Sequence, residues 1–262
     1  MTPSDHPTAL VTGASSGIGA TYADRLARRG HDLVLVARSR DRLDGLAARL
    51  RAETGVAVDV LVADLAAPAA LGSVEARLRD DGRIGLLVNN AGSALPGGIA
   101  DQGPDGVDEL IRLNVTAPAR LAAAVLPRLL AAGTGAIVNI ASVLAVAPEA
   151  MPGVYPATKS FVLTLSQSLA LEAGPRGVYV QAVLPAATRT EIWDKTGTDI
   201  DKVPGLMEVG DLVDAALRGF DRREAVTIPP LQDEAQWETF AAARLAMLPG
   251  FRQSRPGPRY RA

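Results

Sequence analysis

The sequence contains no cysteine among its 262 residues. Disulfide bonds and thiolate metal sites are therefore excluded, and cysteine usage indicates no redox compartment. Histidine is also scarce: His6 lies in a polar N-terminal stretch and His31 precedes an apolar run. Two histidines so far apart in the sequence do not suggest a zinc site, so we expect both at the surface and no bound metal.

Clusters of basic residues and long apolar runs are missing as well. The formal net charge is −2, which argues against a nucleic-acid partner. No apolar run reaches the roughly 20 residues of a membrane span, and the N-terminus lacks a charged-then-apolar signal pattern. We therefore predict a cytoplasmic protein with neither a nucleic-acid partner nor a membrane partner.

The sequence does contain short apolar runs that alternate with longer amphipathic segments. Runs of Val, Ile and Leu indicate strands buried on both faces, as in a parallel sheet covered by helices. The predicted fold class is α/β, a Rossmann-type doubly wound parallel β-sheet flanked by helices in three α/β/α layers. Residues 1–262 are expected to form one domain, with a C-terminal helix and tail at about 232–262.

The boundaries of these elements follow from the same pattern. Strands are predicted at Ala9–Thr12, Asp32–Ala37, Ala57–Ala63, Ile84–Asn89, Ala136–Ala141, Val178–Leu184 and Ala225–Ile228. Helices are predicted at Gly17–Arg29, Arg40–Glu53, Pro68–Arg79, Pro104–Ala131, Val154–Ala173, Val209–Asp221 and Gln232–Leu248. Two prolines, Pro118 and Pro127, are expected to kink or end the fourth of these helices. The Pro- and Arg-rich tail, Pro249–Ala262, is expected to be loosely ordered.

A glycine-rich turn follows the first predicted strand. Residues 13–19 read GASSGIG, and an amphipathic segment comes next. Strand, glycine-rich turn and helix in this order offer backbone N–H groups and a helix N-terminus to a pyrophosphate. The spacing GxxxGxG differs from the GxGxxG pattern, and a plain flexible loop is the alternative. The order of the elements favours the nucleotide site.

Tyr155 and Lys159 are four residues apart, which places both side chains on one face of a helix. A phenol has an ordinary pKa near 10, and a nearby ammonium favours the phenolate. We therefore expect Lys159 to lower the pKa of Tyr155 and to make the tyrosine a proton donor or acceptor for a carbonyl/alcohol pair. Ser142 ends a predicted strand and is placed to hydrogen-bond the substrate carbonyl.

Five motifs occur in a fixed order: TGASSGIG at residues 12–19, NNAG at 89–92, then Asn114, Ser142 and YPATK at 155–159. In this order the chain resembles the single-domain branch of the short-chain dehydrogenase/reductase family, from about Thr8 to Ile228. The resemblance implies a single NAD(P)-binding Rossmann domain and hydride transfer between a nicotinamide cofactor and a carbonyl or alcohol. It also implies a catalytic tetrad of Asn114, Ser142, Tyr155 and Lys159, with Asn114 anchoring a water relay to the lysine. It does not identify the substrate.

The resemblance implies roles in cofactor binding too. Asp64 is similar to an acid that contacts the adenine, with helix N-capping as its alternative. The family usually has glycine after Pro185, where this chain has Ala186. The cofactor-binding residues implied are Gly13, Ser15, Ser16, Gly17, Ile18, Gly19, Asp64, Leu65, Asn90, Ala91, Gly92, Tyr155, Lys159, Pro185, Thr188 and Thr190.

The end of the second predicted strand bears on the choice of cofactor. NAD-binding proteins place an acid there for the ribose 2′-hydroxyl, but this chain has Ala37 followed by Arg38. A guanidinium suits a 2′-phosphate, so NADP(H) is favoured over NAD(H). Against this, Ser16 stands where many NADP-preferring relatives carry Arg or Lys.

Apolar residues predominate where the substrate is expected. The predicted walls of the substrate pocket are Leu95, Leu144 and Trp193, with a substrate loop at about 186–207. They favour an apolar ketone or aldehyde, although Arg189 and Lys195 are able to approach an acidic group. We predict an NADP(H)-dependent oxidoreductase that reduces such a carbonyl. The alternatives are a catalytically silent dinucleotide-binding sensor or scaffold, and an NAD-dependent alcohol dehydrogenase.

The resemblance also implies that two of the helices pair with their copies in a second subunit. On the Val154–Ala173 helix, Phe161, Leu165, Ala170 and Ala173 are expected to face outwards as a second apolar stripe. We therefore predict a homodimer or homotetramer.

Overall fold

The structure, a computed structural model, describes residues 6–193 and 199–261. By their contacts the residues divide into two compact units, Met1–Pro229 and Pro230–Ala262. The first unit contains the sheet and every candidate site residue named above.

A parallel sheet runs through the first unit. Among the described residues it has seven strands in the order β3-β2-β1-β4-β5-β6-β7. The strand order therefore reverses between β1 and β4, where open α/β sheets bind their ligands. The strands match the predicted ones to within one residue at each end: β1 (Thr8–Thr12), β2 (Leu33–Ala37), β3 (Val58–Val62), β4 (Ile84–Asn89), β5 (Ala136–Ile140), β6 (Tyr179–Val183) and β7 (Val226–Thr227).

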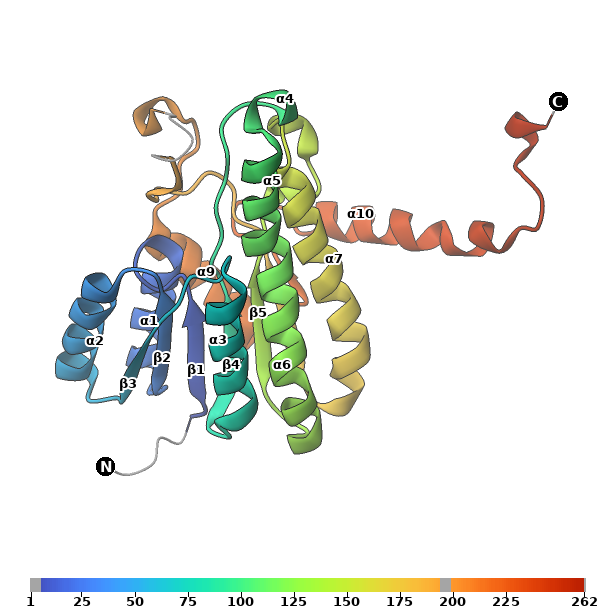
Figure 1. The fold of residues 1–262 in the computed structure, drawn as a ribbon. Helices are drawn as coiled ribbons and strands as arrows, with labels where there is room; N and C mark the ends of the chain where they lie inside the picture. The colour runs from blue at the N-terminus through green and yellow to red at the C-terminus, as the bar shows by residue number, and fades with distance from the viewer. Residues whose placement is uncertain (1–5, 194–198, 262) are drawn as a thin grey trace. The chain divides into compact units, whose positions relative to one another are not determined.

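Helices cover both faces of the sheet and complete the predicted three layers (Figure 1). Each face has its own apolar cluster, and successive residues of β1 enter opposite clusters: Ala9 and Val11 one, Leu10 the other. The helices of the first cluster are α1 (Gly17–Arg28), α2 (Arg40–Thr54) and α9 (Val209–Asp221). Those of the second are α3 (Pro68–Asp80), α6 (Ala117–Ala132) and α7 (Tyr155–Ala173).

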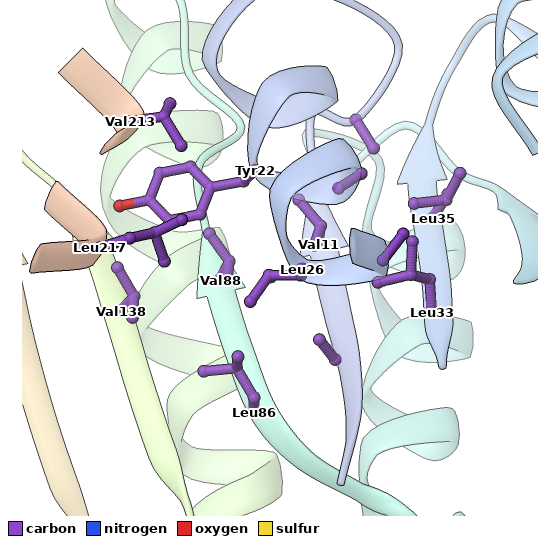
Figure 2. Packing of buried hydrophobic residues seen from close by; sticks show 14 of the residues in the cluster. Val11, Tyr22, Leu26, Leu33, Leu35, Leu86, Val88, Val138, Val213 and Leu217 are labelled. Atoms are coloured by element: carbon purple, nitrogen blue, oxygen red, sulfur yellow. The ribbon is translucent and has the colours of Figure 1, made fainter. Parts of the chain in front are cut away.

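The first cluster includes a buried tyrosine. Figure 2 shows the ring of Tyr22, from α1, beside Val213 and Leu217 of α9. Its hydroxyl is buried and has no hydrogen-bond partner in the described part of the chain. Burial raises the pKa of Tyr22, so the group stays a neutral phenol. α1 is thereby fixed against the sheet, with its N-terminus at the carboxyl edge.

Residues 104–132 depart from the single helix predicted there. A π-helical turn, Arg112–Thr116, separates α5 (Pro104–Ile111) from α6. Figure 1 shows α5 and α6 as one continuous column. Pro118 lies in the first turn of α6, where its missing N–H disturbs little, while Pro127 lies inside α6 without ending it. Such π turns are frequent at functional sites, and this one carries Asn114.

By length and composition this same stretch is the one described helix that could cross a membrane. Its most apolar window has a mean hydropathy of 1.3 and is 39% buried in the chain. α6 packs on α3, α7, β4 and β5, and Leu121, Val125 and Leu129 belong to the second apolar cluster. Its apolar residues therefore serve the core, as those of many core helices do.

A chain of buried amides joins the two central strands. Asn89 of β4 and Asn139 of β5 are partners in the parallel register, and Asn89 Nδ2 donates to Asn139 Oδ1 at 2.9 Å. Asn139 Nδ2 donates in turn to the hydroxyl of Ser166 on α7, at 2.8 Å. Buried polar groups that satisfy one another fix relative positions. Here they hold β4, β5 and α7 together below the candidate site.

The two histidines are neighbours, contrary to the expectation from their separation in the sequence. Their ring centroids are 5.0 Å apart. His31 is half-buried rather than exposed, and burial lowers its pKa. Among the described residues, no group of three or more His, Cys, Asp or Glu side chains is arranged to hold a metal ion.

The second unit contains α10 (Ala235–Ala246), which is shorter than the predicted helix Gln232–Leu248. Two 3₁₀ turns follow, Leu248–Arg252 and Pro258–Tyr260, in the tail that was expected to be loosely ordered. None of the described residues in these three elements is buried.

Candidate active site

Three of the predicted catalytic residues meet at the carboxyl end of β5. Ser142 follows this strand, and Tyr155 and Lys159 lie in the first turns of α7. The Ser142 hydroxyl accepts a hydrogen bond from the backbone N–H of Leu144 at 3.1 Å. The Ser142 side chain also interacts with the Tyr155 hydroxyl and lowers the pKa of this tyrosine. The two hydroxyls thus lie together, as activation of one substrate oxygen requires.

Lys159 is the most constrained member of this group. Its side chain is only 6% exposed, and Nζ donates to the carbonyl oxygen of Ile140 at 2.9 Å. Nζ also lies 5.6 Å from the centroid of the Tyr155 ring. Burial lowers the pKa of Lys159 to about 8, because the charged form loses solvation. At neutral pH the site therefore holds an ammonium that is close to losing its proton.

The pKa of Tyr155 corrects one expectation. Burial raises it to about 12, and the interaction with Ser142 offsets only part of that effect. The sequence predicted a pKa lowered by Lys159. In this structure the loss of solvation decides the direction of the shift, and the Lys159 ammonium lies beside the ring. Tyr155 is consequently a protonated phenol at neutral pH.

Asn114 links the π turn to the rest of the site. It is 2% exposed; its Oδ1 accepts from the backbone N–H of Ser93 at 3.0 Å, and its Nδ2 donates to the Ser93 carbonyl at 2.8 Å. Nδ2 also lies 3.1 Å from the Thr158 hydroxyl, one residue before Lys159. A Cβ added to Gly92 would meet both Asn114 Oδ1 at 3.4 Å and Lys159 Nζ at 3.5 Å. Asn114 and Lys159 therefore flank the same glycine.

The glycine-rich turn is held by the motif that follows β4. Gly13 has φ +65°, and a Cβ there would come within 2.7 Å of Asn90 Nδ2. Asn90 Nδ2 donates to the carbonyl of Thr12 at 2.9 Å, and the Thr12 hydroxyl accepts from the N–H groups of Asn90 and Ala91. A Cβ on Gly19 would overlap the carbonyl oxygen of Gly13. Turn, helix and β4 thus approach more closely than any side chain permits.

α1 begins at the end of this turn, and the first N–H groups of a helix have no partner within the helix. Ser16 is the N-cap residue, but its side chain makes no capping hydrogen bond, and the first turn contains no acidic residue. Ser15, Gly17 and Ile18 are half-exposed beside it. A helix N-terminus with free N–H groups is a ready site for a phosphate.

The adenosine end of the predicted site is less enclosed. Arg38 follows β2 and is exposed, and within the described residues its guanidinium has no hydrogen-bond or ion-pair partner. Asp64 Oδ1 accepts from the N–H of Ala66 at 3.0 Å, whereas the N-cap of α3 is Ala67. The N-capping alternative for Asp64 is therefore not what the structure shows. The next residue, Leu65, is 5% exposed and packs in the second cluster.

The segment that leaves β6 runs towards the glycine-rich turn. The Pro185 carbonyl accepts from the N–H of Val143 at 2.9 Å, which ties the segment to the Ser142 loop. Thr188 is 5% exposed, and its carbonyl accepts from the Trp193 indole at 2.7 Å. The methyl of Thr190 lies 3.2 Å from the Cβ position of Gly17. The predicted residues from β6 thus reach the cofactor side of the site.

The predicted substrate walls are half-buried: Leu95 after β4, Leu144 after β5 and Trp193 after β6. Of the two basic residues considered for an acidic substrate, Arg189 is paired with Glu208 at 2.9 Å. Lys195 lies outside the described residues. Sequence reasoning gave no role to Thr12 or Thr158, whose hydroxyls contact Asn90 and Asn114. Both threonines lie within recognised motifs, TGASSGIG and YPATK, and their polar side chains were the available signal.

Comparison with known proteins agrees with this geometry. A sequence profile described as short chain dehydrogenase matches residues 7–201. A short-chain dehydrogenase from Sphingobium yanoikuyae, solved in complex with NADPH, is 62% identical with a TM-score of 0.96, over 97% of this chain and 100% of that chain. A crystal structure of the bulky-bulky ketone specific alcohol dehydrogenase from Comamonas testosteroni is 54% identical with a TM-score of 0.91, over 98% and 99%.

A more distant curated relative is the very-long-chain 3-oxoacyl-CoA reductase of Anas platyrhynchos. It is 34% identical over 202 residues, which are 74% of this chain and 64% of that protein. The chain thus spans less than two thirds of the length of this relative.

Proposed function

Because this chain belongs to the short-chain dehydrogenase family, we propose that it is an NADP(H)-dependent oxidoreductase that reduces bulky, apolar ketones to secondary alcohols. The observation that carries the proposal is the convergence of the Ser142 and Tyr155 hydroxyls with the buried ammonium of Lys159, 5.6 Å from the tyrosine ring. All three lie at the edge of the sheet where the glycine-rich turn opens.

The residues present fit a dinucleotide phosphate. The close approach of Gly13, Gly19 and Asn90 leaves backbone N–H groups where a pyrophosphate needs them. Arg38, without a partner in the described chain, offers a forked donor to a 2′-phosphate. Position 37 is an alanine, so no acidic side chain there repels this phosphate. The NADPH complex of the relative from Sphingobium yanoikuyae supports this choice of cofactor. When bound, NADPH supplies the hydride that reduces the carbonyl carbon.

The chain itself handles the proton. Ser142 donates a hydrogen bond to the substrate oxygen, and Tyr155 gives that oxygen its proton as the carbonyl becomes an alcohol. A pKa of about 12 keeps the phenol protonated, which suits a donor in the reductive direction. The ammonium of Lys159 stabilises the phenolate that remains. Asn114 fixes the start of α7 through Thr158.

The substrate class follows from the walls of the site. Leu95, Leu144 and Trp193 offer apolar surface, and the nearby Arg189 is engaged by Glu208. A charged metabolite would lose solvation there without gaining a partner. The alcohol dehydrogenase from Comamonas testosteroni is described as specific for bulky-bulky ketones, which supports ketones with two large substituents as the proposed substrate class.

Turnover of a ketone panel tests the proposal. Diaryl and aryl-alkyl ketones, short aliphatic ketones and charged keto acids are compared, each with NADPH and with NADH. We expect NADPH-dependent reduction of the bulky apolar members. Binding of NADPH with no turnover of any ketone would instead favour the silent sensor, and equal rates with NADH would overturn the cofactor assignment.

The assembly and location are inferred along with the activity. We infer a homodimer formed through α6 and α7, since a groove of about 560 Å³ between them is lined mainly by apolar side chains, among them Leu126, Leu130, Leu165 and Leu169. One expectation for this face was wrong: Ala173 is fully buried in the chain's own core, and Leu165 and Ala170 are half-buried against it. Phe161, at 39% exposed, does face outwards. A cytoplasmic location remains a prediction from the sequence.

A further inference from the structure

An ion pair connects two segments that lie far apart in the sheet. Arg42 Nη1 lies 2.9 and 2.7 Å from the two carboxylate oxygens of Glu191. Arg42 is in the first turn of α2, which follows β2, and Glu191 is in the segment that follows β6. Three strands, β1, β4 and β5, separate β2 from β6 in the sheet. With neighbouring strands about 4.8 Å apart, the connection spans roughly 19 Å of the carboxyl edge.

The segment that carries Glu191 passes over the glycine-rich turn. The Thr190 methyl lies 3.2 Å from the Cβ position of Gly17, so the segment before Glu191 rests on the turn. A hollow of about 300 Å³ lies beside it, lined by Gly17, Arg189, Thr190, Glu191 and Ile200. The Arg42–Glu191 pair therefore closes one side of the space where the phosphates of a dinucleotide are expected.

The position of Arg42 also matters for the choice of cofactor. The side chain that reads the ribose 2′ position comes from the end of β2. Arg38 lies there, and Arg42 follows it by four residues at the start of α2. Of these two arginines, Arg42 is already bound to a carboxylate, whereas Arg38 has no partner in the described chain.

We propose that Arg42 is a second ligand of the cofactor's 2′-phosphate, and that Glu191 competes with this phosphate for it. The inference rests on the proposed NADP(H) dependence. Both side chains are 54% exposed, and an exposed ion pair of this kind contributes little net stability. A phosphate monoester carries about −1.5 to −2 charges at pH 7, more than one carboxylate, and so displaces Glu191. Release of Glu191 then frees the segment that carries Thr190 and Trp193, which couples recognition of the 2′-phosphate to the substrate side.

Adenosine 2′,5′-bisphosphate and AMP, which differ only in the 2′-phosphate, are the probes for titration calorimetry. Arg42→Ala is expected to weaken binding of the bisphosphate about tenfold and to leave the affinity for AMP unchanged. Glu191→Gln is expected to strengthen binding of the bisphosphate two- to fivefold, because the competing carboxylate is gone. The affinity for AMP is again expected to stay unchanged. Glu208→Gln is the matched control: it removes a carboxylate paired at 2.9 Å with Arg189 but leaves Arg42 alone, so no change is expected.

Fluorescence gives a second readout that needs no turnover. The chain has two tryptophans, Trp193 and Trp237, so a Trp237→Phe background makes Trp193 the sole reporter. The bisphosphate, but not AMP, is expected to change Trp193 emission. The Glu191→Gln variant is expected to show this changed emission before any ligand is added. An unchanged bisphosphate-to-AMP affinity ratio in both Arg42→Ala and Glu191→Gln would overturn the inference. Failure of the wild-type chain to bind NADPH in the same calorimeter would overturn the proposed function, and this inference with it.

Discussion

The ammonium of Lys159 donates a hydrogen bond of 2.9 Å to the carbonyl oxygen of Ile140, the last residue of β5. Buried backbone oxygens at a strand end need a donor, and this lysine supplies it while standing 5.6 Å from the Tyr155 ring. One side chain thus ties α7 to the sheet and places a positive charge beside the ring of Tyr155. The charge it buries for this purpose has a cost in stability that depends on pH.

Lys159→Met tests that cost. The pKa of Lys159 is about 8 in the folded chain, against an ordinary 10.5. Between these values the unfolded state binds more protons, so stability rises with pH. From about pH 7.5 to 9.5 this contributes on the order of 2 kcal/mol. Tyrosines with an ordinary pKa near 10 begin to titrate at the top of this range, and both proteins contain the same tyrosines. Urea unfolding of the wild type at both pH values measures the rise, which Lys159→Met is expected to lack. If the free energy of unfolding depended on pH identically in the two proteins, the pKa of Lys159 would not be lowered in the folded chain.

Arg38→Ala is expected to reduce the preference for NADPH over NADH. The loss of one charge-assisted contact to the 2′-phosphate costs about 1.5–3 kcal/mol, or roughly ten- to a hundredfold in selectivity. The kcat/KM values for both cofactors measure it, with NADH as the internal control. Unchanged selectivity would show that other groups read the phosphate.

Gly19→Ala probes the close packing of the glycine-rich turn. A Cβ there would overlap the Gly13 carbonyl and Asn90 Nδ2, both held by neighbouring backbone. We expect a loss of more than about 2 kcal/mol in stability and a loss of cofactor binding. Gly45→Ala is the matched control, since nothing lies within 4 Å of its Cβ position inside α2. That change should stabilise by about 0.5–1 kcal/mol. Equal stability of the two variants would refute the packing argument.

The homodimer is tested by light scattering. We expect at least twice the chain's 27.2 kDa at micromolar concentration, and monomers after Leu165→Glu, which places a charge in the apolar groove between α6 and α7. Ala52→Glu, on the exposed side of α2, is the control and should leave the mass unchanged. A wild-type mass near 27.2 kDa would exclude the dimer.

The strands and most helices could be predicted because their patterns are local: continuous Val, Ile and Leu runs mark the parallel strands, and glycine or proline marks their ends. The π turn at Arg112–Thr116 could not, since it depends on tertiary packing, including the contacts of this turn with α7. The sequence therefore predicted that Asn114 lies on a helix but did not predict its hydrogen bonds to Ser93 and Thr158.

The candidate site shows the same division between local and tertiary information. Motif spacing brought Ser142, Tyr155 and Lys159 together, but the pKa of Tyr155 depends on burial, which no spacing reveals. The outward face of α7 was misjudged at Ala173 for a similar reason, because an alanine packs equally well inside or outside. The Arg42–Glu191 pair joins residues 149 positions apart, and only the strand order places them within reach.

Turnover by Tyr155→Phe decides whether the tyrosine hydroxyl supplies the proton. The ring is retained while the hydroxyl, which we take as the proton donor, is removed. General acid catalysis contributes about 10²–10⁴-fold, so ketone reduction should fall by at least that factor. NADPH affinity, measured by titration, should stay near that of the wild type. A Tyr155→Phe protein that bound NADPH normally and kept half of the wild-type reduction rate would contradict the account.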